Sequence, residues 1–251
     1  MLVADKVSHR FGGLQALSGA SFEVKPGSVT SIIGPNGAGK TTLFNIISGV
    51  LRPTGGRVAF AGTDITGWPP YRVAALGLAR TFQNIQLFPS LNALENVMVA
   101  RYCRSRSGVL DALAWLRRDR ADRRRRLEAA HEWLAWVNIA DKRLLLPSEL
   151  PYGHQRRLEI ARALATEPRL IMLDEPTAGM TAGEAQEIMG LVRRLTEIGK
   201  TILLIEHNMN VVMSVSDRIV VLNFGDKIAE GTPAEIRADP RVIEAYLGSD
   251  E

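Results

Sequence analysis

The residues that most clearly indicate chemistry form one glycine-rich stretch, Gly34-Pro35-Asn36-Gly37-Ala38-Gly39-Lys40-Thr41-Thr42. Their spacing fits the P-loop pattern, in which glycines let the backbone curl so that successive N–H groups point at phosphate oxygens. Lys40 would reach the β- and γ-phosphates, and the Thr41 hydroxyl would bind Mg²⁺. A helix that begins here would present its positive end to the same anion. The stretch therefore predicts a nucleotide site.

Two acidic residues far downstream, Asp174 and Glu175, could complete this site. They follow the apolar run Leu170-Ile171-Met172-Leu173, which is typical of a buried parallel strand. Asp174 could hold Mg²⁺ through water, and Glu175 could orient or deprotonate a water in line with the γ-phosphate. An Asp after a strand is often only a helix cap. It is the pairing with a P-loop that favours the Mg²⁺ role.

These residues need a scaffold of alternating strands and helices. We expect a P-loop strand at 29–33 and a helix at 43–48, and the rest of the chain continues the alternation. Apolar periodicity and turn residues predict further strands at 3–7, 20–24, 57–61, 78–82, 201–205 and 218–222, and helices at 69–76, 92–101, 155–165 and 182–198. The segment 147–153 is expected to be a loop. The fold class is α/β, with a mostly parallel sheet in a P-loop NTPase core, a small antiparallel β lobe and an inserted α-helical subdomain.

Length and composition limit the alternatives. A chain of 251 residues with 46% hydrophobic and 23% charged residues is ordinary for a globular protein with one core and a smaller lobe. The N-terminus does not look like a signal peptide, and no apolar run approaches about 18 residues, so we expect neither export nor a membrane span. A single cysteine, Cys103, excludes an intramolecular disulfide.

Basic residues are concentrated in one region. Ten arginines lie between Arg101 and Arg126, and apolar residues at helical spacing follow at Leu127, Ala130, Leu134 and Val137. This pattern predicts a helical lobe with one very basic end. A solvated helix face is the simplest interpretation. Two other interpretations are a surface that binds anionic lipid headgroups and a surface that binds nucleic acid.

Five segments in order, 34–42, Gln83, 150–155, 170–175 and His207, resemble the nucleotide-binding subunit of ABC transporters over essentially the whole chain. Details are similar to the ATPases of branched-chain amino-acid importers. These details are Arg10-Phe11-Gly12-Gly13, Arg80-Thr81-Phe82-Gln83-Asn84, Gln155-Arg156-Arg157-Leu158-Glu159-Ile160-Ala161-Arg162, Ile205-Glu206-His207 and Ala245-Tyr246-Leu247-Gly248.

The resemblance implies an ATPase that uses ATP and Mg²⁺ to drive uptake of branched-chain amino acids or related small solutes through a membrane permease. Phe11 would stack on adenine, and Gln83 would contact Mg²⁺ and the attacking water. His207 would contact the γ-phosphate and hold Glu175. The catalytic set is then Lys40, Gln83, Glu175 and His207, and the metal set is Thr41, Gln83 and Asp174.

The same resemblance implies the assembly. The chain would form one ABC ATPase domain over 1–251, with the helical subdomain at roughly 90–165, placed peripherally on the cytoplasmic face of the inner membrane. A second ATPase subunit, identical or different, would receive the signature residues Pro151, Tyr152, Gly153 and His154 at its ATP site. The Gln83 loop and the helix around 95–100 would face the permease, and an extracytoplasmic solute-binding protein would act indirectly.

Two positions depart from the family pattern. Pro151 stands where the signature Leu-Ser-Gly-Gly-Gln has Ser, which removes a hydroxyl and a backbone N–H. Thr181 stands where the broader family has Asp. We therefore expect a weakened second site and a different ATPase subunit as partner.

Two other functions remain as alternatives. One is a soluble ABC ATPase that acts on nucleic acid or ribosomes, and the other is a small-molecule kinase. The compact single cassette argues against the first, so we do not expect nucleic acid as a partner. The signature residues and His207 would have no role in the second.

Overall fold

The computed structural model describes residues 1–104 and 117–247. These form two compact units, one of Met1–Arg80 with Arg169–Glu251 and one of Thr81–Pro168. We call them the P-loop unit and the helical unit. Arg106 and Trp115 of the basic region and Gly248 of the C-terminal motif lie outside the described residues.

The P-loop unit is built on a six-stranded sheet in the order β10-β9-β3-β8-β7-β6. The strands are β3 (Val29–Ile33), β6 (Leu78–Arg80), β7 (Leu170–Asp174), β8 (Thr201–Ile205), β9 (Arg218–Asn223) and β10 (Asp226–Gly231). All neighbours pair in parallel except β10, which runs antiparallel to β9. Every residue of β3, β7 and β8 is buried, as expected for central strands of a parallel sheet. The doubly wound, mostly parallel sheet is confirmed.

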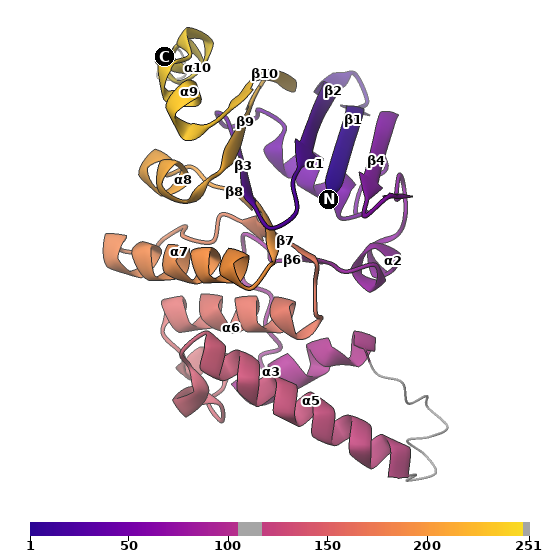
Figure 1. Cartoon of the computed structure of the whole chain (residues 1–251), viewed down its shortest axis with the longest axis vertical. Helices are drawn as coiled ribbons and strands as arrows, with labels where there is room; N and C mark the ends of the chain where they lie inside the picture. Colours follow the sequence, from indigo (N-terminus) through magenta and orange to yellow (C-terminus); the bar gives the residue numbers. More distant parts are fainter. Residues whose placement is uncertain (105–116, 248–251) are drawn as a thin grey trace. The chain divides into compact units, whose positions relative to one another are not determined.

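A second sheet of the same unit is the predicted antiparallel lobe. Its order is β2-β1-β4-β5, from β1 (Leu2–Phe11), β2 (Leu14–Val24), β4 (Gly55–Phe60) and β5 (Thr63–Asp64). Figure 1 shows β2, β1 and β4 side by side, and Leu2 pairs with Val24 on one side and Phe60 on the other. Along β1, buried and more exposed residues largely alternate, which is the pattern of a sheet with one solvated face.

Six helices complete the P-loop unit in the described chain: α1 (Lys40–Ile47), α2 (Pro70–Ala75), α7 (Ala182–Glu197), α8 (Met209–Val215), α9 (Pro233–Ala238) and α10 (Pro240–Leu247). Leu43 and Phe44 of α1 enter one buried cluster with residues of both sheets. That cluster fixes the helix that follows the P-loop. The elements β5, β10 and α8 to α10 were not predicted from the sequence.

The helical unit consists of α3 (Ala93–Ala100), η1 (Arg101–Arg104), α5 (Arg117–Trp136), η2 (Ala140–Lys142), η3 (Pro147–Glu149) and α6 (Tyr152–Ala165). Helices α3, α5 and α6 pack on one another. The inserted helical subdomain therefore exists as a compact unit. The predicted loop at 147–153 is wrong, because η3 and the first turn of α6 occupy it.

The basic region is only partly a solvated face. Arg126 is buried, pairs with Asp122 at 3.2 Å and lies over the Tyr102 ring. Arg124 is exposed and pairs with Glu128 one turn along the helix. Leu127, expected on the apolar face, is exposed, whereas Ala130 and Leu134 are buried as expected.

Within the described ranges, no helix combines the length and the apolar character that a membrane span requires.

Candidate functional site

The P-loop backbone has a shape that only glycine allows at two positions. Gly34 has φ 151°, and a Cβ there would lie 2.0 Å from the Leu222 carbonyl oxygen. Gly39 has φ 96°, and its Cβ would lie 2.5 Å from the Ala16 carbonyl oxygen. The loop is thus pressed against β9 on one side and against β2 on the other, which holds its N–H groups in a fixed curve.

Lys40 spans the mouth of this loop. Its Nζ donates to the carbonyl oxygens of Gly34 at 2.7 Å and Pro35 at 2.8 Å. Burial lowers the pKa of the ammonium group, while the negative charges of Glu175 and Asp174 act in the opposite direction. A phosphate could replace the two carbonyls as the partner of this cation. The next side chain, Thr41, is exposed and accessible to a metal ion.

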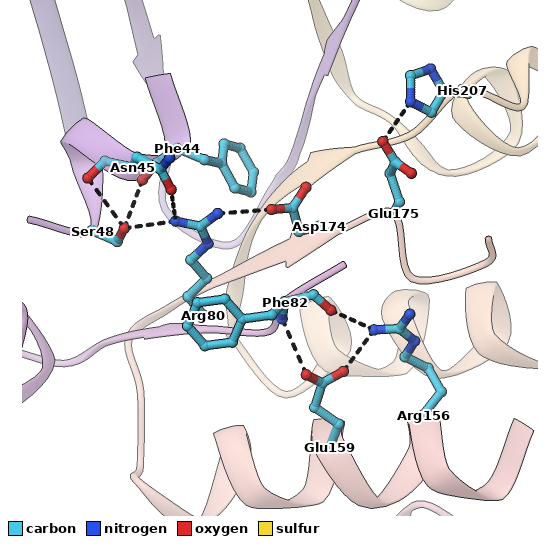
Figure 2. A network of polar contacts seen from close by, with 10 residues as sticks. All are labelled: Phe44, Asn45, Ser48, Arg80, Phe82, Arg156, Glu159, Asp174, Glu175 and His207. Carbon is cyan, nitrogen blue, oxygen red and sulfur yellow. Dashed lines mark hydrogen bonds and ion pairs between the residues drawn. The ribbon is translucent and has the colours of Figure 1, made fainter. Parts of the chain in front are cut away.

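Asp174 ends β7 and is tied to Arg80 at the end of β6. Arg80 Nη2 donates to Asp174 Oδ2 at 2.8 Å, and both side chains are almost fully buried. Arg80 Nη1 donates to Asn45 Oδ1 on α1 at 2.7 Å and to Oγ of Ser48, the C-cap of α1, at 2.9 Å (Figure 2). One guanidinium group therefore connects the metal-site candidate Asp174 to the helix that follows the P-loop.

Glu175 and His207 lie against each other after β7 and β8. His207 Nε2 is 2.5 Å from Glu175 Oε1 (Figure 2). The Glu175 N–H donates to the Ile205 carbonyl oxygen at 2.9 Å. Glu175 has φ 47°, in the left-handed region that costs a residue with a side chain about 1 to 3 kcal/mol. The Glu175 side chain is 14% exposed and His207 45%, so the pair reaches solvent mainly from the histidine side.

Glu206 supports this pair and was quoted in the sequence analysis without a role. Its buried carboxylate accepts hydrogen bonds from the Thr177 N–H at 2.9 Å, the Thr177 hydroxyl at 2.5 Å and the His207 N–H at 3.1 Å. It thereby joins the loop after β7 to the loop after β8. A carboxylate directly after an apolar strand was the sequence signal that could have indicated it.

Phe11 ends β1 and is 48% exposed. Its ring packs edge-on against His9 at 4.4 Å between centroids. Phe11 is therefore not a core residue. An exposed aromatic face is what stacking on a base requires.

Gln83 and the signature residues belong to the helical unit, where α6 brings them together. Arg156, fully buried, donates to the carbonyl oxygens of Phe82 at 2.7 Å and Gln83 at 2.9 Å, and it pairs with Glu159 at 2.7 Å. Glu159 in turn accepts from the Phe82 N–H at 3.1 Å (Figure 2). Tyr152 Oη lies 3.3 Å from Arg156 Nη2. These bonds explain why the strand predicted at 78–82 ends at Arg80, since the polar backbone groups of Phe82 are used by α6.

Pro151 is the N-cap of α6, with no side-chain capping hydrogen bond. Tyr152, Gly153 and His154 form the first helical turn, and the His154 N–H already donates to the Pro151 carbonyl oxygen at 2.9 Å. The N–H groups of Tyr152 and Gly153 precede the first intrahelical bond of α6, so these are the backbone groups that could face a phosphate. His154 can no longer be expected to donate through its backbone.

Thr181 has a local structural role. It is the N-cap of α7, and its hydroxyl forms a capping box with Glu184. A hydroxyl serves this purpose well, so the departure from Asp at this position leaves the helix start intact.

The oxygen groups present suit Mg²⁺ bound together with a nucleotide. Across residues 1–104 and 117–247, no three His, Cys, Asp or Glu side chains gather as a metal cage. Mg²⁺ usually keeps waters and phosphate oxygens and takes only one or two protein ligands. An exposed hydroxyl at Thr41 and a fixed carboxylate at Asp174 meet that requirement.

Comparisons with known proteins point to the same kind of nucleotide site. Residues 17–178 match the family model described as ABC transporter, and residues 227–251 match that of the branched-chain amino acid ATP-binding cassette transporter. The chain is 45% identical to the high-affinity branched-chain amino acid transport ATP-binding protein BraF of Pseudomonas aeruginosa, over 99% of this chain and 98% of that protein. It is 41% identical to LivG of Escherichia coli, over the same shares of the two chains.

Solved structures of ABC transporter cassettes have the same fold as this chain. The ADP conformation of MJ1267, an ATP-binding cassette of an ABC transporter, superposes with a TM-score of 0.86 at 35% identity, covering 99% of this chain and 98% of that one. The dimeric structure of MJ0796, a bacterial ABC transporter cassette, has a TM-score of 0.79 at 28% identity, covering 93% and 99%.

Proposed function

The chain belongs to the ATP-binding proteins of branched-chain amino acid ABC transporters, and on this premise we propose that it hydrolyses Mg-ATP to drive uptake of branched-chain amino acids or related small solutes. The observation that carries the proposal is the arrangement after β7 and β8. There, the Glu175 carboxylate is held by His207 and acts electrostatically on the P-loop residue Lys40. This arrangement suits hydrolysis of a phosphate bound in the P-loop.

Each candidate site residue has its own part in the proposed reaction. The loop N–H groups and Lys40 bind the phosphates, and Phe11 stacks on the adenine. Thr41 and Asp174 would hold Mg²⁺, Gln83 would be a further contact, and the bound ion would neutralise phosphate charge. Glu175 orients the attacking water and accepts its proton, and His207 keeps the carboxylate directed at that water. The left-handed backbone of Glu175 fixes this orientation in advance.

The proposed partners are a second ATPase subunit and a membrane permease. Residues 151–154 at the start of α6 would complete the ATP site of the second subunit, and the dimeric relative supports such an assembly. The permease would contact the Gln83 segment and α3. An extracytoplasmic solute-binding protein would act on this subunit only indirectly, through the permease. The protein would then lie peripherally at the cytoplasmic face of the inner membrane. Since its relatives are transport proteins, an action on nucleic acid or ribosomes is not retained.

Two substitutions test the mechanism, because they remove different steps. Lys40→Ala should lose nucleotide affinity, whereas Glu175→Gln keeps the shape and should bind ATP but hydrolyse it at least about a hundredfold more slowly. Phosphate release and equilibrium binding of ATP measure the two effects, each with and without Mg²⁺. Glu197→Gln, at the exposed end of α7, is the control. Normal hydrolysis by Glu175→Gln would show that the assigned role is wrong.

A further inference from the structure

Glu206 is a buried carboxylate that the proposed mechanism does not use. It follows Ile205, the last residue of β8, and only 3% of its surface is exposed. A carboxylate can be buried at low cost only if hydrogen bonds replace the water that it loses. The partners that supply these bonds therefore indicate what this residue does in the folded chain.

The two oxygens of Glu206 hold two different loops. Oε1 accepts hydrogen bonds from the Thr177 N–H at 2.9 Å and from the Thr177 hydroxyl at 2.5 Å, in the loop after β7. Oε2 accepts from the His207 N–H at 3.1 Å, in the loop after β8. All three partners are donors, which suits an ionised carboxylate, since it can only accept. One side chain thus links the two loops through separate atoms.

Both loops carry a member of the proposed catalytic pair. Thr177 lies two residues after Glu175, and His207 is the partner of that glutamate. The Glu175 N–H donates to the Ile205 carbonyl oxygen at 2.9 Å, and Glu206 adds a second link one residue further along the chain. Together these links fix the separation of the two loops at the point where His207 Nε2 contacts Glu175 Oε1 (Figure 2).

The His207 ring depends on this support because its side chain is 45% exposed. Its direction toward Glu175 is then set mainly by the position of its backbone, which Glu206 holds at the N–H. A Glu175 carboxylate without its directing group could turn away from the attacking water. A misplacement of about 1 Å can reduce a rate about a hundredfold.

We propose that Glu206 is a positioning residue for ATP hydrolysis, which holds His207 against Glu175 by bridging the two loops. This inference rests on the proposed function, because it assigns Glu206 a role at the same site. Glu206 touches neither ATP nor Mg²⁺ in this role and acts through His207. Its loss should therefore slow the chemical step and leave nucleotide binding at the P-loop unchanged.

Glu206→Gln tests the bridge, because a carboxamide has nearly the same size but only one acceptor oxygen. If that oxygen serves Thr177, the amide NH2 group faces the His207 N–H, and a donor meets a donor. If the oxygen serves His207 instead, both bonds to Thr177 are lost. One loop is released in either case. Thr177→Val is a milder variant, because it removes the hydroxyl and keeps the N–H.

We expect Glu206→Gln to lower kcat about tenfold to a hundredfold, with KM and the Kd of ATP within about twofold of the wild type. Thr177→Val should lower kcat about threefold. Glu235→Gln is the matched control, because the Glu235 carboxylate also accepts from the N–H and the hydroxyl of one threonine, Thr232, but at the start of α9. It should keep kcat within about twofold. Phosphate release and titration calorimetry measure these values.

A double-mutant cycle with His207→Ala distinguishes positioning from a general structural role. If Glu206 acts through the histidine, adding Glu206→Gln to His207→Ala should lower kcat by less than about twofold more. A general disturbance of the fold would slow both backgrounds by the same factor. Single-turnover phosphate release measures the slow variants, and circular dichroism shows whether each is folded. If Glu206→Gln does not fold, the same cycle is run with Thr177→Val, whose effect should disappear in the His207→Ala background.

The outcomes separate the two proposals. If the wild type binds no ATP, the proposed function fails. If the wild type hydrolyses ATP and Glu206→Gln does so equally fast, Glu206 has no positioning role while the ATPase remains. Equal effects in the two backgrounds, or a loss of ATP affinity as large as the loss of kcat, would also overturn the role. Normal hydrolysis by His207→Ala would overturn it too, because Glu206 would then hold a residue that the reaction does not need.

Discussion

Arg80 in the P-loop unit and Arg156 in the helical unit are both buried, and each pairs with a buried carboxylate at 2.7 to 2.8 Å. Their remaining partners differ. Arg80 joins side chains, namely Asp174, Asn45 and Ser48, across three elements. Arg156 also holds two backbone carbonyls, those of Phe82 and Gln83, against a single helix.

The two carboxylates differ in the same way. Glu159 accepts from Arg156 and from the Phe82 N–H, and burial raises its pKa while Arg156 acts against the rise. Its bonds serve the local structure of the Gln83 segment. Asp174 lies at the end of a central strand beside the P-loop, where we propose that it also serves Mg²⁺. The comparison therefore distinguishes a buried ion pair that shapes a loop, Arg156 with Glu159, from one that positions the carboxylate proposed to bind Mg²⁺, Arg80 with Asp174.

The largest loss of stability is expected when the arginine of either buried ion pair is replaced and its carboxylate is kept. Arg156→Met leaves Glu159 buried without its cation and two carbonyls without their donor. Arg80→Met removes the cation beside Asp174 and the donor to Asn45 and Ser48. Each should lower the free energy of unfolding by about 3 to 5 kcal/mol. Urea denaturation measures the loss. Arg124→Met breaks an exposed pair and should cost less than about 1 kcal/mol. Comparable losses for all three variants would mean that burial of the pairs contributes little.

Replacing both members of each ion pair by neutral residues should show that only the Arg80–Asp174 pair is needed for ATP hydrolysis. Arg156→Met with Glu159→Gln leaves no unpaired charge, and Gln can still accept from Phe82, so it should recover the stability lost through the unpaired charge and should keep ATP hydrolysis. The loss that is due to the Phe82 and Gln83 carbonyls should remain. Arg80→Met with Asp174→Asn should recover stability but keep hydrolysis at least about tenfold low, because the charge proposed for Mg²⁺ is gone. Phosphate release across a range of Mg²⁺ concentrations measures this. Full activity of the second double variant would show that Asp174 has no role toward the metal.

The secondary structure could be predicted from the sequence where a motif requires particular elements beside it. A P-loop requires a strand and a helix, and 29–33 was predicted residue for residue as β3, as was 201–205 as β8. Asp174 and Glu175 were placed correctly at the end of β7, because a short apolar run bounded by polar residues limits where a buried strand can end. The resemblance to a family supplied the order of the remaining site residues.

The sequence was uninformative where a contact joins distant segments. Arg80 and Arg156 were quoted inside motifs without a role, since their partners Asp174 and Gln83 lie 94 and 73 residues away. The start of α6 was predicted too late, at residue 155, because 147–153 was predicted as a loop; in the structure Pro151 is the N-cap and the helix begins at Tyr152.

The smallest effect, and the one that tests the helical unit by itself, concerns Pro151. As the N-cap of α6 it offers no side-chain acceptor to the first helical turn. Pro151→Ser supplies a hydroxyl that can accept from that turn and should raise the free energy of unfolding by about 1 kcal/mol. The same hydroxyl could instead donate to a phosphate of the second subunit, which should raise hydrolysis by the purified protein about tenfold or more. Pro151→Ala is the control, because it restores the backbone N–H without a hydroxyl. If Ser and Ala increase hydrolysis equally, the missing group is the N–H; if neither does, the helix start already donates well enough through Tyr152 and Gly153, and a different ATPase subunit is not required by this residue.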